Sequence, residues 1–227
     1  IINKLKKDHG LEYKLDGIVI SNGAKHSLFN LFQVLIEEGD EVIIPAPYWV
    51  TYPEQVKFSD GVPVFIETDD STDFKITAEQ LKAVITPKTK ILLLNTPSNP
   101  TGSVYSKEEL LSLGEVLKGT DIIVLSDEMY EKIMYNGKKF TAAAEVSEDM
   151  YKRTVTINGL SKAVAMTGWR FGYIATCDAA LAKAMTKLQG QVTSNINTMT
   201  QYAAIPALEG DADETIEMMR VEFEKRK

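Results

Sequence analysis

Lys162 follows a stretch of residues that favours a buried strand. Residues 154–157 are rich in β-branched side chains, and Asn158 and Gly159 then end the run. A lysine just beyond a buried strand lies where an α/β sheet presents its ligands. There it can act as a point charge, a base or a nucleophile that forms a Schiff base. A loop lysine taken alone is more often simply solvated, so the residues that accompany Lys162 decide between these interpretations.

Polar, aromatic or glycine residues directly follow five of the predicted strands. The carboxyl ends of parallel strands share one edge of a sheet, so we expect these side chains to converge. Each has an ordinary structural explanation by itself: a turn for Asn99, a helix cap for Asp127 and packing for the aromatic rings. Their occurrence together, beside a lysine, favours a ligand site. The residues are Asn22 to Lys25, Tyr48 and Trp49, Asn95 and Asn99, Asp127 and Tyr130, and Asn158 to Lys162.

This set of side chains matches one ligand in particular. Gly23 and Ala24 open a predicted helix, whose exposed N–H groups can bind phosphate, and Arg170 can clamp the same phosphate bidentately. Trp49 can stack on an aromatic ring. Asp127 can keep a basic ring nitrogen protonated, and lysine forms an imine with an aldehyde. Together these properties describe a site for pyridoxal phosphate.

Strands and helices alternate along the chain. The strands are predicted within 16–22 and at 41–44, 62–67, 90–95, 121–126, 154–157 and 170–176. The helices are predicted at 1–10, 23–38, 48–58, 77–85, 106–118, 179–189 and 197–208, and from 213 onwards. Such alternation implies a mostly parallel sheet with right-handed crossovers, and the continuous apolar strands fit burial on both faces. We therefore expect a three-layer α/β/α domain.

Composition excludes several classes of protein. The 227 residues are 44% hydrophobic and carry a net charge of -7, which disfavours a nucleic-acid partner. Cys177 is the single cysteine, so no intrachain disulfide is expected and a reducing, cytoplasmic compartment fits. With only His9 and His26 beside it, no metal site is expected. No apolar run is long enough for a membrane span.

Several motifs carry a resemblance to a known family. The segments 95–102 (NTPSNPTG) and 126–130 (SDEMY), and Ser161-Lys162 with Arg170 beyond them, resemble the class I and II aminotransferases of fold type I. The segments 47–53 (PYWVTYP) and 165–173 (AMTGWRFGY) resemble the bacterial aspartate aminotransferase subgroup in particular. The resemblance runs in order through essentially the whole chain.

The resemblance implies roles for four polar residues. Lys162 would hold the pyridoxal 5′-phosphate as an internal aldimine and then shuttle the proton between the substrate Cα and C4′. Asp127 would pair with the pyridinium nitrogen. Tyr130 and Asn99 would hydrogen-bond the phenolic oxygen of the cofactor, and Asn99 would also touch the substrate α-carboxylate. Lys162, Asp127 and Tyr130 are thus the expected catalytic residues.

The remaining expected contacts are with the ring, the phosphate and the substrate. By the same resemblance, Trp49 would stack on the cofactor ring and border the substrate, while Gly23, Ala24 and Arg170 would bind the phosphate. Lys25 corresponds to a position that can reach a distal substrate carboxylate, which favours dicarboxylic amino and 2-oxo acids. A solvated lysine at a helix start is an equally good explanation of Lys25.

The chain also departs from the family pattern. Gly159 stands where many members carry a phosphate-binding serine. The resemblance implies a large cofactor domain at 1–208, with 209–227 beginning a helix that leads to an absent small domain. That small domain would supply the arginine for the substrate carboxylate. The N-terminal segment that covers the substrate is absent as well, and with it a phosphate-binding tyrosine that the neighbouring subunit of a homodimer supplies. We therefore expect an inactive or nearly inactive piece of an aminotransferase.

Other functions remain open at this point. Residues 159–163 are one residue short of a nucleophile-elbow pattern, but a hydrolase of that kind needs a histidine after the serine, and both histidines precede it. Aromatic and prephenate aminotransferases, β-lyases and aminocyclopropane carboxylate synthases share the cofactor residues. A non-catalytic, aminotransferase-like regulatory domain is a further alternative.

Overall fold

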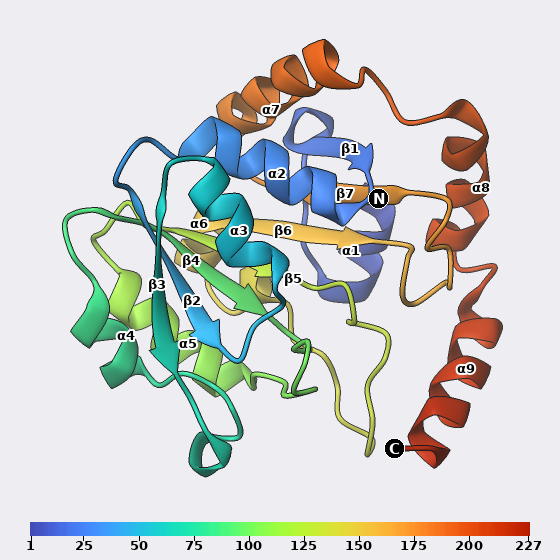
Figure 1. The fold of residues 1–227 in the computed structure, drawn as a ribbon. Coiled ribbons are helices and arrows are strands. Elements are labelled where there is room, and N and C mark those ends of the chain that lie inside the picture. Colours follow the sequence, from blue (N-terminus) through green and yellow to red (C-terminus); the bar gives the residue numbers. More distant parts are fainter.

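A seven-stranded sheet forms the centre of the computed structural model, which describes residues 1–227 (Figure 1). The strand order is β1-β7-β6-β5-β4-β2-β3. The strands are β1 (Ile18–Asn22), β2 (Glu41–Ala46), β3 (Val62–Glu67), β4 (Thr89–Asn95), β5 (Ile123–Asp127), β6 (Thr154–Gly159) and β7 (Phe171–Ala175).

Nine α-helices and three short 3-10 turns connect the strands. The helices are α1 (Ile2–His9), α2 (Ala24–Leu35), α3 (Thr51–Phe58), α4 (Ala78–Val84), α5 (Lys107–Leu117), α6 (Glu148–Arg153), α7 (Ala179–Val192), α8 (Thr198–Glu209) and α9 (Asp213–Lys225). The turns are η1 (Leu15–Gly17), η2 (Asp70–Thr72) and η3 (Ala143–Glu145).

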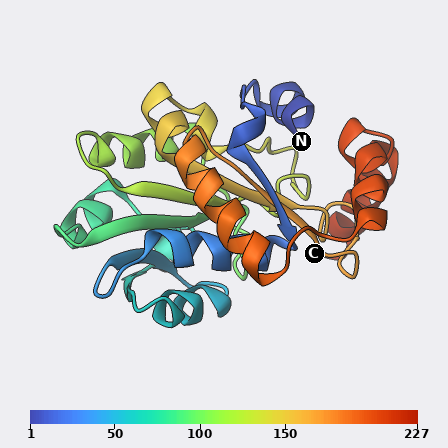
Figure 2. The same cartoon turned by 90° about the horizontal axis from the view of Figure 1, so that it is seen from above.

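The sheet is buried on both faces, as the apolar strands predict. Along β4, Ile91 and Leu93 belong to one hydrophobic cluster, whereas Leu92 and Leu94 belong to another. This alternation follows from the two-residue period of a strand. Helices α2, α3 and α7 pack against the first face, and α4, α5 and α6 against the second. Seen from above, the helices lie on both sides of the sheet (Figure 2), so the three-layer prediction is confirmed.

The direction of β7 matters for the site. It pairs antiparallel with both β1 and β6, whereas the pairs among β2, β3, β4, β5 and β6 are parallel. The start of β7 therefore lies at the same edge as the carboxyl ends of the other strands. This reversal brings Arg170, directly before β7, to the edge where Lys162 lies.

Helix boundaries follow the local sequence signals in most places. Both Ser106 and Thr77 form the capping boxes that begin α5 and α4. The predicted helix at 48–58 begins only at Thr51, and the sequence prediction missed α6. Helix α6 begins where the Ser147 hydroxyl accepts a hydrogen bond from the Met150 N–H. None of the helices combines the length and apolar character that a membrane crossing requires.

Candidate functional site

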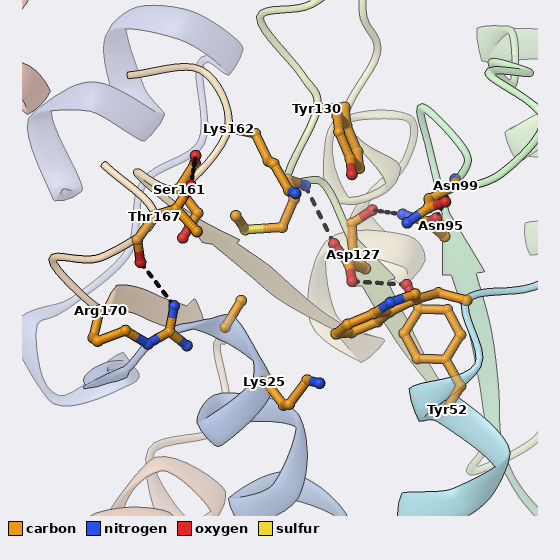
Figure 3. Close-up of a pocket in the computed structure, with 13 residues that line it drawn as sticks. Lys25, Tyr52, Asn95, Asn99, Asp127, Tyr130, Ser161, Lys162, Thr167 and Arg170 are labelled. Atoms are coloured by element: carbon orange, nitrogen blue, oxygen red, sulfur yellow. Dashed lines mark hydrogen bonds between the residues drawn. The ribbon is translucent and has the colours of Figure 1, made fainter. Parts of the chain in front are cut away.

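A cavity of about 310 Å³ opens at the carboxyl edge of the sheet. Thirteen residues line it (Figure 3). They come from the last residues of β4 and β5, from the segments that follow β1, β2, β4, β5 and β6, and from the residue before β7. The structure thus brings the predicted residues together from distant parts of the sequence. Those among the lining residues are Ala24, Lys25, Trp49, Asn99, Asp127, Tyr130, Lys162 and Arg170.

A buried carboxylate lies at the inner end of this cavity. Asp127 is the last residue of β5 rather than the residue after it. Its Oδ2 accepts a hydrogen bond from the Tyr52 hydroxyl at 2.8 Å, and its Oδ1 accepts one from the Met129 N–H at 3.3 Å. Burial raises the pKa of Asp127 to about 6, although both hydrogen bonds and the charge of Lys162 oppose this rise. A cation beside Asp127 would therefore be strongly favoured.

Lys162 enters the cavity from the turn that follows β6. Its side chain is exposed, and its Nζ lies 5.5 Å from the centre of the Tyr130 ring (Figure 3). The Thr167 hydroxyl donates to the Ser161 carbonyl at 2.9 Å, which closes the loop that carries the lysine. The amine is therefore accessible to a ligand and close to both Tyr130 and Asp127.

The beginning of α2 and the guanidinium of Arg170 form an anion cradle. Gly23 has a φ of 85°, and a Cβ there would overlap the Arg170 guanidinium. A Cβ on Gly172 would overlap the Ala24 backbone nitrogen. Glycine at 172 lets the N-terminus of α2 approach the start of β7 so closely, and glycine at 23 leaves room for the guanidinium. Arg170 donates to the carbonyls of Thr167 and Asn22 at 3.0 and 3.4 Å. The charge of the Arg170 guanidinium and the first N–H groups of α2 then lie around the same part of the cavity, where an anion can bind.

Aromatic and amide side chains border the rest of the cavity. Trp49 is half-buried and stands at 86° to the Tyr52 ring, and the Lys25 Nζ lies 4.7 Å from the centre of the Trp49 ring. Asn95 donates to the Asp127 carbonyl at 3.0 Å and accepts from the Asn99 N–H at 2.7 Å. These bonds hold the turn in which Asn99 borders the cavity.

Comparison with known proteins agrees with this geometry. The family model for aminotransferase class I and II matches residues 1–227. The chain belongs to this family. The aspartate aminotransferase of Bacillus sp. (strain YM-2) is 52% identical over 226 residues, which cover 100% of the chain and 57% of that protein. The asparagine–oxo-acid transaminase of Streptococcus mutans is 48% identical, over 97% of the chain and 56% of that protein.

Solved structures of aminotransferases share the fold. The aspartate aminotransferase from Rhizobium meliloti superposes with a TM-score of 0.96 and 43% identity, over 99% of the chain and 56% of that structure. The Thermus thermophilus enzyme with maleate gives a TM-score of 0.94 and 38% identity, over 99% of the chain and 58% of that structure. The predicted family and fold class are therefore confirmed. The chain spans about 57% of the length of the curated relatives it matches.

Some residues of this cavity escaped the sequence interpretation. Besides Tyr52, Met129 and Thr167 line the cavity without having been singled out, whereas Asn95 and Ser161 had been grouped with the strand-end residues but given no role. Tyr52 lies three residues after Trp49, within a motif already singled out, and that proximity was the available signal. Its partner Asp127 is 75 residues away, and sequence spacing alone does not reveal such a hydrogen bond.

The structure also explains the glycine at position 159. Gly159 is buried at the end of β6, where a Cβ would lie 2.5 Å from the Phe171 carbonyl oxygen. A serine does not fit there without moving β7. Ser161 lies two residues further along and lines the cavity.

Proposed function

We propose that the whole protein is a pyridoxal-phosphate-dependent aminotransferase with Lys162 as the residue that binds the cofactor covalently. The observation that carries this proposal is that Lys162, Asp127 and Arg170 border one cavity. The donor set fits the cofactor, because a buried carboxylate suits a ring nitrogen and the glycine-lined cradle suits a phosphate. Covalent attachment would require the Lys162 amine, which is exposed and lies 5.5 Å from the centre of the Tyr130 ring.

Each lining residue then has a defined task. Gly23, Ala24 and Arg170 hold the phosphate, and Trp49 covers one face of the ring. Asp127 keeps the ring nitrogen protonated. When bound, the cofactor supplies an electron-withdrawing ring that makes the substrate Cα–H acidic.

Three side chains act nearest to the reacting atoms. Lys162 moves the proton between the substrate Cα and the cofactor C4′. Tyr130 and Asn99 donate hydrogen bonds to the phenolic oxygen of the cofactor, and Asn99 also orients the substrate α-carboxylate. Tyr52 orients the carboxylate of Asp127 through its 2.8 Å hydrogen bond.

We further propose aspartate with 2-oxoglutarate as the substrate pair, and a cytoplasmic homodimer as the working form. Lys25 supports a dicarboxylic substrate, because its exposed amine stands beside Trp49 at the cavity. Several relatives are named aspartate aminotransferases, and others aspartate/prephenate aminotransferases. The residues that precede and follow this part in the relatives would complete the substrate site, with residues 1–208 as the cofactor domain and 209–227 leading to the small domain.

Transfer of labelled nitrogen tests this function. The whole protein, pyridoxal 5′-phosphate, 2-oxoglutarate and ¹⁵N-aspartate should yield ¹⁵N-glutamate, and the Lys162→Ala variant should not. A β-lyase needs an amino acid with a leaving group on Cβ, which aspartate lacks, so it would yield no labelled glutamate. Absence of labelled glutamate, or equal transfer by Lys162→Ala, contradicts the proposal. The 227-residue chain alone should give little or no transfer.

A further inference from the structure

A buried cluster of charged residues lies behind the turn that follows β5. Glu131, whose side chain is 4% exposed, accepts from the His9 Nε2 at 2.8 Å and pairs with the Lys4 Nζ at 2.5 Å. The His9 side chain is itself only 7% exposed, and its Nδ1 lies 3.3 Å from a carboxylate oxygen of Glu145. Helix α1 is thus joined by ion pairs to the turn after β5 and to η3.

Tyr130 and Glu131 are adjacent residues whose side chains lie on opposite sides of this turn. Tyr130 lines the cavity, whereas Glu131 contacts α1. The turn is short and hydrogen-bonded: the Glu131 N–H donates to the Glu128 carbonyl at 3.1 Å, and the Ile133 N–H donates to the Tyr130 carbonyl at 2.8 Å. A fixed Glu131 side chain therefore restricts where the adjacent Tyr130 ring can lie.

The cluster is an ion-pair network rather than a metal site. One ligand atom each of Asp8, His9 and Glu131 lies within 4.8 Å of the others, a spacing that a metal ion could bridge. However, the Lys4 Nζ already neutralises Glu131, and the Lys132 Nζ lies 2.8 Å from Asp8. Lysine ammonium groups thus occupy the positions where a metal ion would have to bind.

Both members of the central pair are charged at neutral pH. Burial disfavours the charged His9 ring, yet the hydrogen bonds to Glu131 and Glu145 raise the pKa of His9 to about 9. Burial likewise disfavours ionised Glu131, but His9 and Lys4 lower the pKa of Glu131 to about 2. Hydrogen bonds between buried charged groups are among the strongest in proteins. The pair is therefore suited to hold two segments together.

We propose that His9 and Glu131 are positioning residues for the cofactor site. Their ion pair anchors the turn after β5 to α1 and so keeps the Tyr130 phenol at the cavity. The anchoring follows from the contacts themselves, while the effect on the cofactor rests on the function proposed for Tyr130.

Hydrogen exchange in the 227-residue chain without cofactor tests the anchoring. In His9→Ala, the amides of Glu131 and Ile133 should exchange about tenfold faster, because a buried charged hydrogen bond is lost. Amides paired between β4 and β5 should keep their exchange rates. Lys7→Ala is the matched control, since Lys7 lies on the same helix in an exposed ion pair with Asp213. It should change none of these rates.

Two further variants separate anchoring from a general loss of stability. His9→Gln can still donate one hydrogen bond to Glu131 but carries no charge, so it should recover part of the protection. Glu145→Ala removes only one partner of His9 and gives a milder comparison if His9→Ala does not fold. The proposal is overturned if the Glu131 and Ile133 amides exchange at equal rates in His9→Ala and Lys7→Ala. It is also overturned by acceleration spread evenly over the turn and the central strands.

A second measurement, with cofactor added, links the anchor to the site. With pyridoxal 5′-phosphate bound, the pH at which its visible absorption changes should shift in His9→Ala and not in Lys7→Ala. An unshifted midpoint in His9→Ala overturns the link to Tyr130. If the wild-type chain gives no visible band, the proposed function fails, while the exchange rates still decide whether His9 anchors the turn.

Discussion

Tyr52 donates its phenolic hydroxyl to the Oδ2 of Asp127 at 2.8 Å, and both side chains are buried. The bond joins α3 to the end of β5, so one element fixes the carboxylate that another element provides. It also favours the ionised form of Asp127, whose pKa burial raises to about 6. Tyr52 is thus placed to control the one acid at the inner end of the cavity.

Removal of this hydroxyl should raise the pKa of Asp127 further. In Tyr52→Phe the ionised carboxylate loses a donor, so we expect an increase of roughly one pH unit. Carbon-13 NMR titration of the aspartate carboxyl groups in the chain without cofactor measures the change. Tyr105→Phe, which removes a buried phenol bonded to the Ile76 N–H, is the control and should leave the pKa of Asp127 unchanged. An unchanged or lower pKa in Tyr52→Phe contradicts the assigned role.

The phosphate cradle depends on the absence of a side chain at Gly23. Gly23→Ala should weaken the binding of pyridoxal 5′-phosphate about tenfold, because the added methyl group displaces the Arg170 guanidinium. Gly39→Ala is a matched control, since Gly39 has a φ of 84° with nothing within 4 Å. Backbone strain should cost Gly39→Ala about 1 kcal/mol of unfolding free energy, and Gly23→Ala about 1–3 kcal/mol, since Gly23 with ψ 157° lies in a region that is essentially restricted to glycine. Equal cofactor affinities in the two variants argue against the cradle.

A serine at position 159 should not improve the site. Gly159→Ser should lower the free energy of unfolding by about 2 kcal/mol, since its Cβ meets the Phe171 carbonyl within the paired strands β6 and β7. Gly168→Ser, where a Cβ meets nothing within 4 Å, should change it by no more than about 0.5 kcal/mol. Urea denaturation compares the two. A Gly159→Ser chain as stable as wild type shows that β7 can move aside.

The His9 ion pair should stabilise the fold in a pH-dependent manner. The pKa of His9 is raised from 6.5 to about 9, so its charge stabilises fully below pH 6.5, and this stabilisation is lost as the pH rises through about 9. The free energy of unfolding of wild type should exceed that of His9→Gln by at most roughly 3 kcal/mol at about pH 6. At about pH 10 the two free energies should differ little. The charged or titratable groups near the ring are Lys4, Asp8, Glu128, Glu131, Lys132, Glu145 and Tyr173.

Urea denaturation at the two pH values gives this difference directly. Lys7→Ala is again the control, and its free energy of unfolding should lie close to that of wild type at both pH values. The difference in free energy of unfolding between wild type and His9→Gln should be smaller at the higher pH. An equal or larger difference there is inconsistent with a charged His9.

The sequence was informative where chemistry and local signals coincide. Strand ends followed by Gly23, Asn99, Asp127 and Lys162 predicted one site at one edge of the sheet, and the structure places these residues in or beside the same cavity. The helices expected from Thr77 and Ser106 begin with these residues as caps, because the capping hydrogen bonds form within four residues.

Long-range contacts account for what the sequence did not reveal. The Tyr52–Asp127 bond and the His9–Glu131 pair join residues 75 and 122 positions apart, and no local pattern encodes either. The reversed direction of β7, which delivers Arg170 to the site, also depends on pairing with β1 and β6. The steric reason for Gly159 became visible only once β7 was in place.

The absorption spectrum of the purified chain with pyridoxal 5′-phosphate tests the central claim most directly. We predict a visible band that borohydride removes, with the reduced cofactor then found on Lys162 by peptide mass spectrometry. Lys162→Ala should lack both the band and the adduct, whereas Lys25→Ala, which changes another exposed lysine of the cavity, should keep them. A featureless wild-type spectrum, or an equal band and adduct elsewhere in Lys162→Ala, would contradict the assignment of Lys162.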